Sequence, residues 1–408
     1  MMTDDFPYPA VDRFLARRPR PPRVLALGEP LHGVETFPLL RNALLRGLVE
    51  HRGTRLVALE SDCLKGRLVD AHVRGDGTAL DPTMSRGFSH GWGDRPSNRA
   101  LVEWLGARNR GAGANDAVGF AGFDAPMEIT GAESPRAALR LLHGFLTDHA
   151  PSVPHPWERI DALLGDDVRW THPRVMWEPS RSVGDTADAR ELRVITDDLQ
   201  RLLAGVAPRY AAGDTAGALR DAELGARTAA GLLAYHRVLA ETGPEERMSR
   251  ALGLRDTMMA ENLAALADRE RGRGPLLAFA HNQHLRRGVA SMRMTGVRPA
   301  WSPAGAHLDR ALGPEYVVIA LAIGSAPHLG IDAPPPDSVE GRLCAASPEP
   351  RLVSGGELAR LRAGSGDLTA RGTDDFAYFP LDPDGLDDYD AILFLPRLAP
   401  PPPGAATP

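Results

Sequence analysis

Acidic and histidine side chains follow the first two short apolar runs of the chain. Glu29 and His32 come just after residues 24–27, and Glu60 comes directly after residues 56–59. Carboxylates and imidazoles are the side chains that most often move protons near neutral pH. These positions are therefore the first candidates for catalytic chemistry.

The same arrangement recurs further along the chain. Asp124 closes a third apolar run and His281 follows a fourth, with Asn282 and His284 just beyond. Ligands of parallel sheets bind outside the carboxyl ends of the strands. If the four runs are parallel strands, we expect these polar groups to converge at one edge of one sheet.

The segment from Gly28 to Gly33 could form a catalytic pair. Its two glycines bracket Glu29 and His32, so a tight loop could aim both side chains into one pocket. The histidine would act as a general base, and the carboxylate would fix its tautomer. The alternative is a plain turn with a solvated glutamate and a capping histidine.

Glu60, His281 and His284 allow two kinds of chemistry. A carboxylate directly after a buried strand has a raised pKa or needs a partner, unless it only caps a helix. The two histidines could be a base and an electrophile. Together with Glu29, His32 and Glu60 they would also suffice for a zinc site. The alternative is one packed core histidine and one surface histidine.

Arginine supplies nearly all of the positive charge. Lys65 is the single lysine among 47 basic residues, which argues against a phosphate-binding or Schiff-base lysine. Arg41 follows His32 by nine residues, and Arg255 lies among apolar positions. A buried arginine must pair with a carboxylate or bind an anionic group, whereas a surface arginine is merely solvated.

The apolar runs predict an α/β fold with a mostly parallel sheet flanked by helices. A strand, a loop, a helix and a second strand follow one another in the first 59 residues, which is a βαβ unit. Residues 81–86 and the Pro-rich residues 331–350 are predicted to be loops. We predict strands at residues 24–27, 56–59, 118–123, 276–280, 316–323 and 390–395.

The chain is expected to divide into five segments. A largely helical insertion interrupts the core and forms part of the active-site cleft. The segments are an N-terminal extension at 1–22, the first half of the core at 23–133, the helical insertion at 134–270, the second half of the core at 271–396, and a Pro-rich, disordered tail at 397–408.

Charge and composition narrow the possible partners. The formal net charge of −6 argues against a nucleic-acid-binding surface and against a polybasic membrane anchor. No run of 18 apolar residues occurs, so no membrane-spanning helix is expected. Two cysteines make no disulfide framework, and no signal peptide is recognisable, so we expect a cytoplasmic protein. The sequence leaves the oligomeric state open.

One further motif is short and weak. Residues 87–91 match the G-x-S-x-G pattern around Ser89. A nucleophile elbow needs a buried strand directly before the serine, and residues 81–86 are predicted to be a loop. We therefore interpret this segment as a Gly-rich loop. No dinucleotide fingerprint follows any predicted strand, and no cofactor is expected.

Taken in order, the short motifs resemble those of the erythromycin esterase family. They span about residues 23–396, and their order and spacing are specific although each alone is weak. They are Gly28-Glu29-x-x-His32-Gly33, Arg41, Val57-Ala58-Leu59-Glu60, Gly122-Phe123-Asp124, Arg255-Asp256-x-x-Met259-Ala260-x-Asn262, Ala280-His281-Asn282-x-His284, Gly305-x-His307-Leu308 and Tyr389-Asp390-Ala391.

The resemblance implies a parallel sheet whose halves are separated by a helical region. It also implies hydrolysis of the lactone ester of 14-membered macrolides without a serine or cysteine nucleophile, and we expect no metal. His32 would be the general base that activates water. His281 would be the second essential imidazole, with His284 nearby.

The resemblance also implies supporting roles. Glu29 and Glu60 would orient and tune the histidines. Arg41 and Arg255 would hold the carboxylates or the developing oxyanion. The residues expected beside the substrate are Trp92, Asp124, Asn282 and His284.

One departure from the family pattern leaves the substrate open. The family tends to have a glutamate after the tryptophan, and Ser97-Asn98 stands there instead. This stretch should border the pocket. Three alternatives therefore remain: acyl transfer, cyclisation or elimination on a biosynthetic intermediate; a metal-dependent hydrolase using the histidines and a glutamate; and a binding protein with a degenerate site.

Overall fold

A seven-stranded sheet forms the centre of the computed structural model, which describes residues 6–113, 115–129, 131–293, 296–372 and 378–400. Its order is β10-β11-β9-β1-β6-β2-β3, and β10 alone runs antiparallel to its neighbour. The α/β prediction is confirmed, and β10 is a strand that was not predicted. The strands are β1 (Val24–Glu29), β2 (Leu56–Asp62), β3 (Gly119–Asp124), β6 (Leu276–His281), β9 (Tyr316–Ser325), β10 (Arg351–Ser354) and β11 (Ala391–Arg397).

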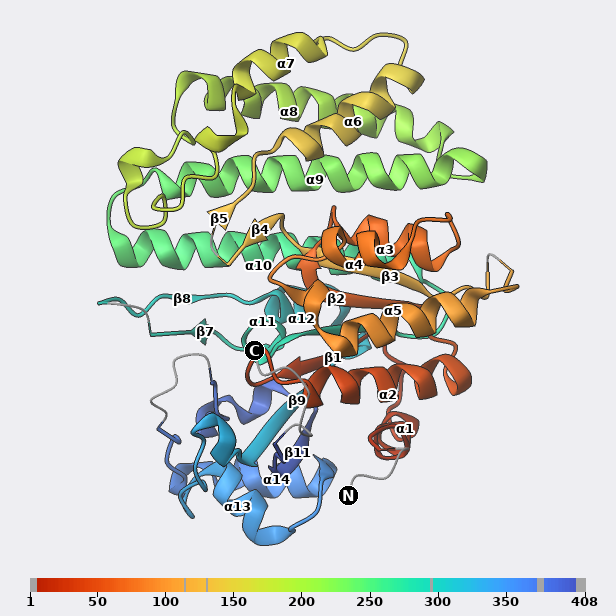
Figure 1. The fold of residues 1–408 in the computed structure, drawn as a ribbon. Coiled ribbons are helices and arrows are strands. Elements are labelled where there is room, and N and C mark those ends of the chain that lie inside the picture. The colour runs from red at the N-terminus through yellow and green to blue at the C-terminus, as the bar shows by residue number, and fades with distance from the viewer. Residues whose placement is uncertain (1–5, 114, 130, 294–295, 373–377, 401–408) are drawn as a thin grey trace.

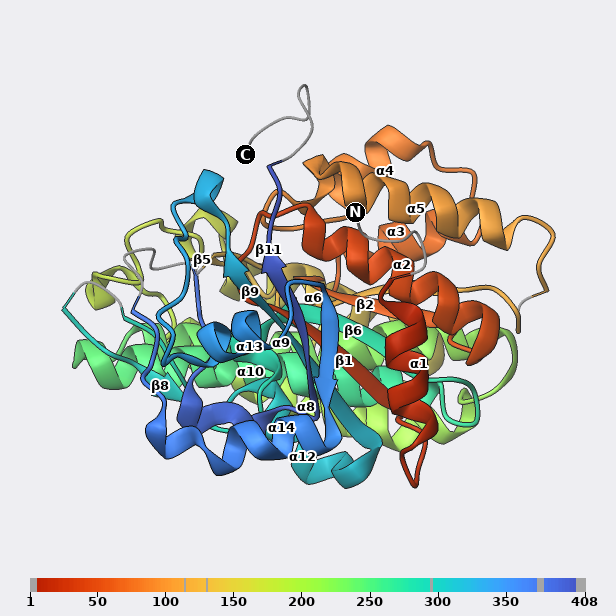
Figure 2. The same ribbon diagram turned by 90° about the horizontal axis from the view of Figure 1, so that it is seen from below.

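Helices cover both faces of this sheet (Figure 2). Leu25 and Leu27 of β1 pack on one layer, and Val24 and Ala26 pack on the other. Strands buried on both faces require the near-continuous apolar runs seen in the sequence. The first layer holds α1 (Tyr8–Ala16), α2 (Thr36–His51), α3 (Gly66–Val73), α4 (Leu80–Arg86) and α5 (Pro96–Asn109). The second holds α10 (Pro244–Arg269), α11 (Asn282–Leu285), α12 (Ala304–Leu312), α13 (Val339–Ala346) and α14 (Gly355–Ala363).

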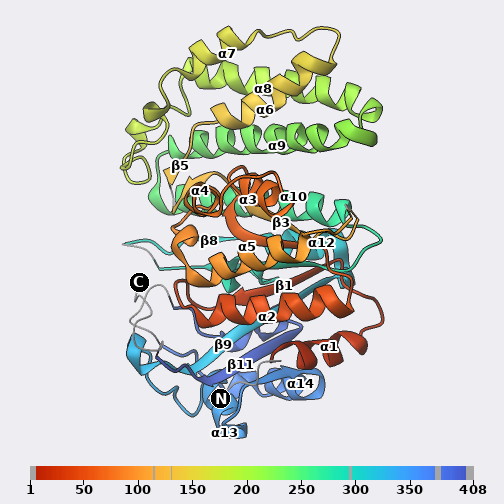
Figure 3. The same ribbon diagram turned by 45° about the vertical axis from the view of Figure 1, so that its right-hand side comes forward.

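A helical lobe lies beyond α10 (Figure 1). It has a hydrophobic core of its own, built from α6 (Arg136–His149), α7 (Trp157–Leu164), α8 (Ala187–Val206) and α9 (Ala216–Leu239). Helix α9 packs on α10, and α10 packs on β3, so α10 joins the lobe to the sheet (Figure 3). No helix in the described ranges combines the length and the apolar character needed to cross a bilayer.

Two small hairpins complete the description of the chain. Strand β4 (Met127–Glu128) pairs with β5 (Gly131–Ala132), directly after the end of β3. Strand β7 (Ala290–Ser291) pairs with β8 (Ala300–Trp301), shortly after α11. Each hairpin thus follows a strand that ends in one of the candidate site residues.

Two of the loop predictions are wrong. Residues 81–86 form most of α4, because Pro82 lies in the first turn, where a missing N–H costs nothing. Residues 339–346 form α13, since Ser338 accepts a hydrogen bond from the Gly341 N–H and caps the helix after the Pro-rich stretch. Much of the tail predicted to be disordered, residues 401–408, lies outside the described residues.

The close approach of β1 to α11 can be tested at Gly28. A Cβ atom at Gly28 would lie 2.2 Å from Oδ1 of Asn282, so Gly28→Ala should lower the free energy of unfolding by about 1–3 kcal/mol. Gly106→Ala is the matched control, because a Cβ atom there meets nothing within 4 Å. In mid-helix it should instead stabilise by about 0.5–1 kcal/mol. Urea titrations would measure both, and equal midpoints for Gly28→Ala and the wild type would contradict the packing.

Candidate active site

Strand register brings the candidate residues together. Glu29 ends β1 and pairs in register with His281, which ends β6. Glu60 follows Leu59 of β2, the register partner of Phe279 in β6. Asp124 ends β3, the next strand along. The four strands are neighbours in the sheet, so their polar ends lie at the same edge, as the sequence pattern led us to expect.

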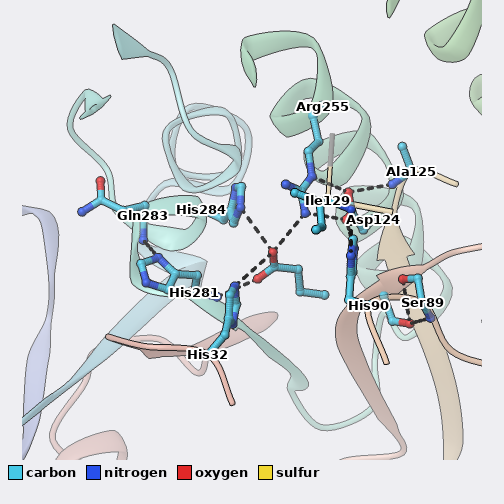
Figure 4. A network of polar contacts seen from close by, with 12 residues as sticks. His32, Ser89, His90, Asp124, Ala125, Ile129, Arg255, His281, Gln283 and His284 are labelled. Carbon is cyan, nitrogen blue, oxygen red and sulfur yellow. Dashed lines mark hydrogen bonds and ion pairs between the residues drawn. The ribbon is translucent and has the colours of Figure 1, made fainter. Parts of the chain in front are cut away.

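Glu60 is the centre of the network. Figure 4 labels three side chains of this network, His32, His284 and Arg255. Oε1 of Glu60 accepts a hydrogen bond from Nη2 of Arg255 at 3.1 Å and lies 3.3 Å from Nε2 of His284. Nε2 of His32 is 3.7 Å from the same oxygen. Oε2 accepts from the backbone N–H of His281 at 2.8 Å. One buried carboxylate therefore faces three cationic or titratable side chains.

The surroundings of Glu60 keep it ionised. Burial alone would raise the pKa of this carboxyl group. The charges of His284, His32 and Arg255 outweigh burial and hold the pKa well below its usual range. Glu60 is therefore a permanent negative charge at the sheet edge.

His32 is the part of this network that a substrate can reach. Its Nδ1 lies 2.7 Å from Oε1 of Glu29, and its side chain is 41% exposed. The ring packs at 5.3 Å from the ring of Trp92 and at 5.0 Å from that of His281. Burial lowers the pKa of His32, but Glu60 and Glu29 outweigh it and raise the pKa overall.

His284 is held as a cation. Its Nδ1 lies 2.9 and 3.0 Å from the two carboxylate oxygens of Asp256, and Glu60 faces its other nitrogen. Burial opposes the charge, but the two carboxylates raise the pKa of His284 to about 10. Asp256 is itself fixed by the indole N–H of Trp301 and the backbone N–H of Ala304. His284 therefore balances the charge of Glu60.

His281 is held as a neutral ring. Its Nδ1 accepts a hydrogen bond from the Gln283 N–H at 3.2 Å, which leaves the ring proton on Nε2. Burial, followed by the nearby His32, lowers the pKa of His281 to about 3. Its Nε2 is buried and faces the backbone carbonyl of Pro30. A neutral imidazole therefore lies beside His32.

Arg255 and Arg41 have different surroundings. Arg255 donates from Nε and Nη2 to Asp124, at 3.0 and 2.7 Å, besides its bond to Glu60. Arg41 is 1% exposed and contacts no carboxylate within ion-pair distance among the described residues. It donates to the amide oxygens of Asn42 and Asn98, and burial lowers its pKa to about 9. Arg255 therefore holds carboxylates, and Arg41 does not.

The residues expected beside the substrate divide into two groups. Trp92 lines the cavity, and its indole N–H donates to the backbone carbonyl of Glu60 at 2.9 Å. Asn282 donates to the Leu321 carbonyl and lies against Gly28, so it packs into the sheet. Asp124 and His284 are buried behind Glu60 and support the network from within.

A small cavity opens at His32. Its volume is about 30 Å³, which is room for a water molecule or a small group of a substrate. The residues that line it include Glu29, His32, Arg41, Glu60, Trp92, Arg95, Asn98 and Phe279. Within the described ranges, no three His, Cys, Asp or Glu side chains converge in a way that could hold a metal ion. His284 could become a ligand only by leaving one of its two carboxylate partners.

Three contacts of this network were not predicted from the sequence. Asp256 holds His284, Asn98 holds Arg41, and His90 holds Asp124. Asp256 stands beside Arg255 in a motif already quoted, and His90 lies inside the G-x-S-x-G match. Nothing in the local sequence shows that either side chain turns toward a partner more than 25 residues away.

The fold and this site define an α/β protein with a network of carboxylates, histidines and arginines at the carboxyl ends of neighbouring parallel strands. The chain belongs to the erythromycin esterase family. The sequence profile described as "Erythromycin esterase" matches residues 49–398. The matched stretch contains Glu60, Asp124, Arg255 and His281, and it begins after Glu29, His32 and Arg41.

The individual relatives share low sequence identity with this chain or match only a short part of it. The type II erythromycin esterase of Escherichia coli is 32% identical over 104 residues, which cover 26% of this chain and 24% of that protein. A mutant of the erythromycin esterase EreC in its open conformation is similar in structure, with a TM-score of 0.65 and 18% identity, over 93% of this chain and 91% of that one. A Bacillus cereus protein has a TM-score of 0.66 and 14% identity, over 92% of this chain and 88% of that one. A succinoglycan biosynthesis protein has a TM-score of 0.64 and 14% identity, over the same shares of the two chains.

The opposite protonation states of His284 and His281 should appear in the pH dependence of stability. His284 has a folded-state pKa raised to about 10, so the stability it contributes is full below the unfolded pKa of 6.5 and is lost as pH rises towards 10. His281 has a folded-state pKa lowered to about 3, so its contribution is present above 6.5 and is lost as pH falls towards 3.

Urea unfolding at a series of pH values would measure both effects. His284→Asn should remove a slope of up to about 1.4 kcal/mol per pH unit above pH 6.5, and His281→Asn should remove a slope of opposite sign below it. Each variant serves as the control for the other. Parallel curves for wild type and His284→Asn above pH 6.5 would show that His284 is not held as a cation.

Proposed function

We propose that this chain is a hydrolase that opens an ester or lactone by water attack, with His32 as the general base. The observation that carries the proposal is the position of His32. The Nδ1–H of His32 donates a hydrogen bond to Glu29, while Nε2 faces Glu60 and a cavity that can hold a water molecule. That pairing leaves the Nε2 lone pair available for the proton of a water molecule.

The reaction follows from these contacts. His32 removes a proton from water as the water oxygen bonds to the carbonyl carbon. The negative charge that develops on the carbonyl oxygen needs a donor, and Arg41 lines the cavity beside His32. The carbon–oxygen bond to the alcohol then breaks, and the leaving oxygen takes the proton from His32. The products are a carboxylic acid and an alcohol.

The rest of the network stabilises the protonated form of His32. Glu60 lies 3.7 Å from Nε2 and stabilises the imidazolium that forms during the reaction. Arg255 and His284 keep Glu60 ionised, so the stabilising charge is in place before substrate binds. Arg41, which has no carboxylate partner among the described residues, lines the same cavity and could approach the carbonyl oxygen or another anionic group.

The substrate in this proposal is a small molecule with an ester or lactone bond. Family membership supports the reaction class, and the names of the E. coli relative and EreC make a macrolide lactone the first candidate. Asn98 lines the cavity and accepts a hydrogen bond from Arg41, so the side chain at position 98 adds no charge to the cavity wall. A cytoplasmic location is part of the same proposal.

Mass spectrometry of erythromycin incubated with the purified chain would test the reaction. The product should gain one water, and in water enriched in oxygen-18 its new carboxyl group should carry one heavy oxygen. His32→Ala should lower the rate about 10²–10⁴-fold. His51→Ala is the matched control, because His51 is exposed at the end of α2 and should leave the rate unchanged.

Other products would redirect the proposal. A product of unchanged mass or one that has lost water would indicate cyclisation or elimination, and transfer to an added alcohol would indicate acyl transfer. Erythromycin left intact while a p-nitrophenyl ester is cleaved would keep the hydrolase and change the substrate. Full activity in His32→Ala would contradict the role of His32.

The pH profile gives an independent test of the base. Because the pKa of His32 is raised above 6.5, kcat/KM should rise with pH through a midpoint above that value. Glu29→Gln removes the carboxylate from Nδ1, so this midpoint should move to lower pH. Glu50→Gln is the control, because Glu50 is an exposed carboxylate on α2. An unmoved midpoint in Glu29→Gln would show that another group titrates.

A further inference from the structure

The G-x-S-x-G segment has a role that the proposed reaction does not use. Ser89 is buried, and its Oγ accepts a hydrogen bond from the Asp62 N–H at 2.9 Å. The Ser89 N–H donates to Oγ of Ser61 at 3.0 Å. These bonds fix the segment to the end of β2, so Ser89 is an anchor. The residue that it places against the network is His90.

The backbone at this point adopts a conformation that a histidine rarely takes. His90 has φ +57°, and Ile129 of the β4–β5 hairpin has φ +58°. A left-handed conformation is unfavourable for a residue that carries a Cβ atom. Two such residues in contact indicate that their surroundings hold the backbone in place.

His90 makes contacts that account for this conformation. Its Nε2 lies 3.3 Å from Oδ2 of Asp124, and its Nδ1 accepts from the Ile129 N–H at 3.2 Å. The backbone N–H of His90 donates to Oε2 of Glu128 at 2.7 Å. Because Nδ1 accepts, the neutral ring carries its proton on Nε2 and donates to Asp124. One ring therefore ties the hairpin to the buried carboxylate (Figure 4).

Asp124 transmits this contact to the catalytic centre. It is fully buried, and it receives two hydrogen bonds from Arg255 and one from the Ala125 N–H besides that from His90. Arg255 in turn holds Oε1 of Glu60, which faces His32. An unbroken series of contacts thus runs from the hairpin to the general base.

We propose that His90 is a positioning residue, which holds Asp124 and, through it, Arg255 in register with Glu60. The inference rests on the proposed function, since it assigns His90 a part in the same site. The hairpin gains a role as well. Ile129 at its turn is 76% exposed, so a substrate that contacts Ile129 would act on the same ring that holds Asp124.

A glycine substitution separates side chain from backbone. His90→Gly removes the ring and relieves the left-handed strain, so the variant should fold at least as well as wild type. We expect its kcat on erythromycin, or on a p-nitrophenyl ester if only that is cleaved, to fall about tenfold, with KM changed much less. His90→Gln restores a donor at the same reach and should recover most of kcat. A glycine variant with wild-type kcat would overturn the proposal.

A variant of Lys65 separates the effect of the His90 ring on Asp124 from the effect of anchoring the hairpin. Lys65 lies 3.2 Å from Glu128 and 3.0 Å from Glu133, so it also anchors the hairpin. Within the described ranges its ion pairs reach these two residues and Asp62 but not Asp124. Lys65→Met should therefore keep kcat within about twofold of wild type, below the effect of one hydrogen bond. If Lys65→Met loses as much activity as His90→Gly, hairpin anchoring explains the loss and His90 has no role of its own.

A measurement without turnover keeps this test independent of the proposed reaction. In His90→Gly, Arg255 is less firmly held near Glu60, so the pKa of His32 should rise. NMR titration of the ring nitrogens would detect a rise of about half a unit. An unchanged pKa of His32 would overturn the positioning role. If the wild-type chain cleaves no ester at all, the proposed function fails, and this titration still decides the role of His90.

Discussion

The burial of the Glu60 carboxylate is the constraint on which the rest of the site depends. It lies at the end of a strand covered on both faces, where an ionised carboxylate is stable only beside opposite charge. Arg255 and His284 provide that charge, and each needs a carboxylate of its own, Asp124 and Asp256. Acidic and basic side chains therefore alternate through the site, and the series ends at His32, which lines the cavity.

This alternation gives the three histidines of the site three different electrostatic surroundings. His284 lies between two carboxylates and is a cation, whereas His281 is buried beside other imidazoles and is neutral. His32 differs from both, since it has carboxylate neighbours and an exposed edge. The same residue type can therefore serve as counter-ion, as hydrogen-bond donor and, in the proposed reaction, as base. Environment decides each role, so residue identity alone could not assign them.

The sequence predicted the frame of the site better than its interior. Apolar runs ending in Glu29, Glu60, Asp124 and His281 were enough to place four strands, because strands buried on both faces leave a clear local pattern. The strand β10 was missed because it is short and half-buried at the edge of the sheet.

The partners of these strand ends had no such local signal. His90 and Asp256 reach the network from a loop and a helix distant in the chain, and only the packing of those elements reveals the contacts. Prolines gave misleading signals for residues 81–86 and 339–346, because a proline in or before a first turn begins a helix as readily as it marks a loop. Arg41 was expected to hold a carboxylate or the developing oxyanion, and its contacts with amides and an aromatic ring had no local signal.

The order of strands has a consequence for how the protein is made. Both neighbours of β1, β6 and β9, come from residues beyond 275, and β6 also separates β1 from β2. While the ribosome is still producing the helical lobe, β1 has no partner on either edge and Glu29 has no fixed place beside Glu60. The lobe has its own core and can fold during this interval. Strand β6 enters the sheet between β1 and β2 and therefore brings the candidate site residues together, so a chain stopped before residue 276 contains most of those residues but cannot form the site.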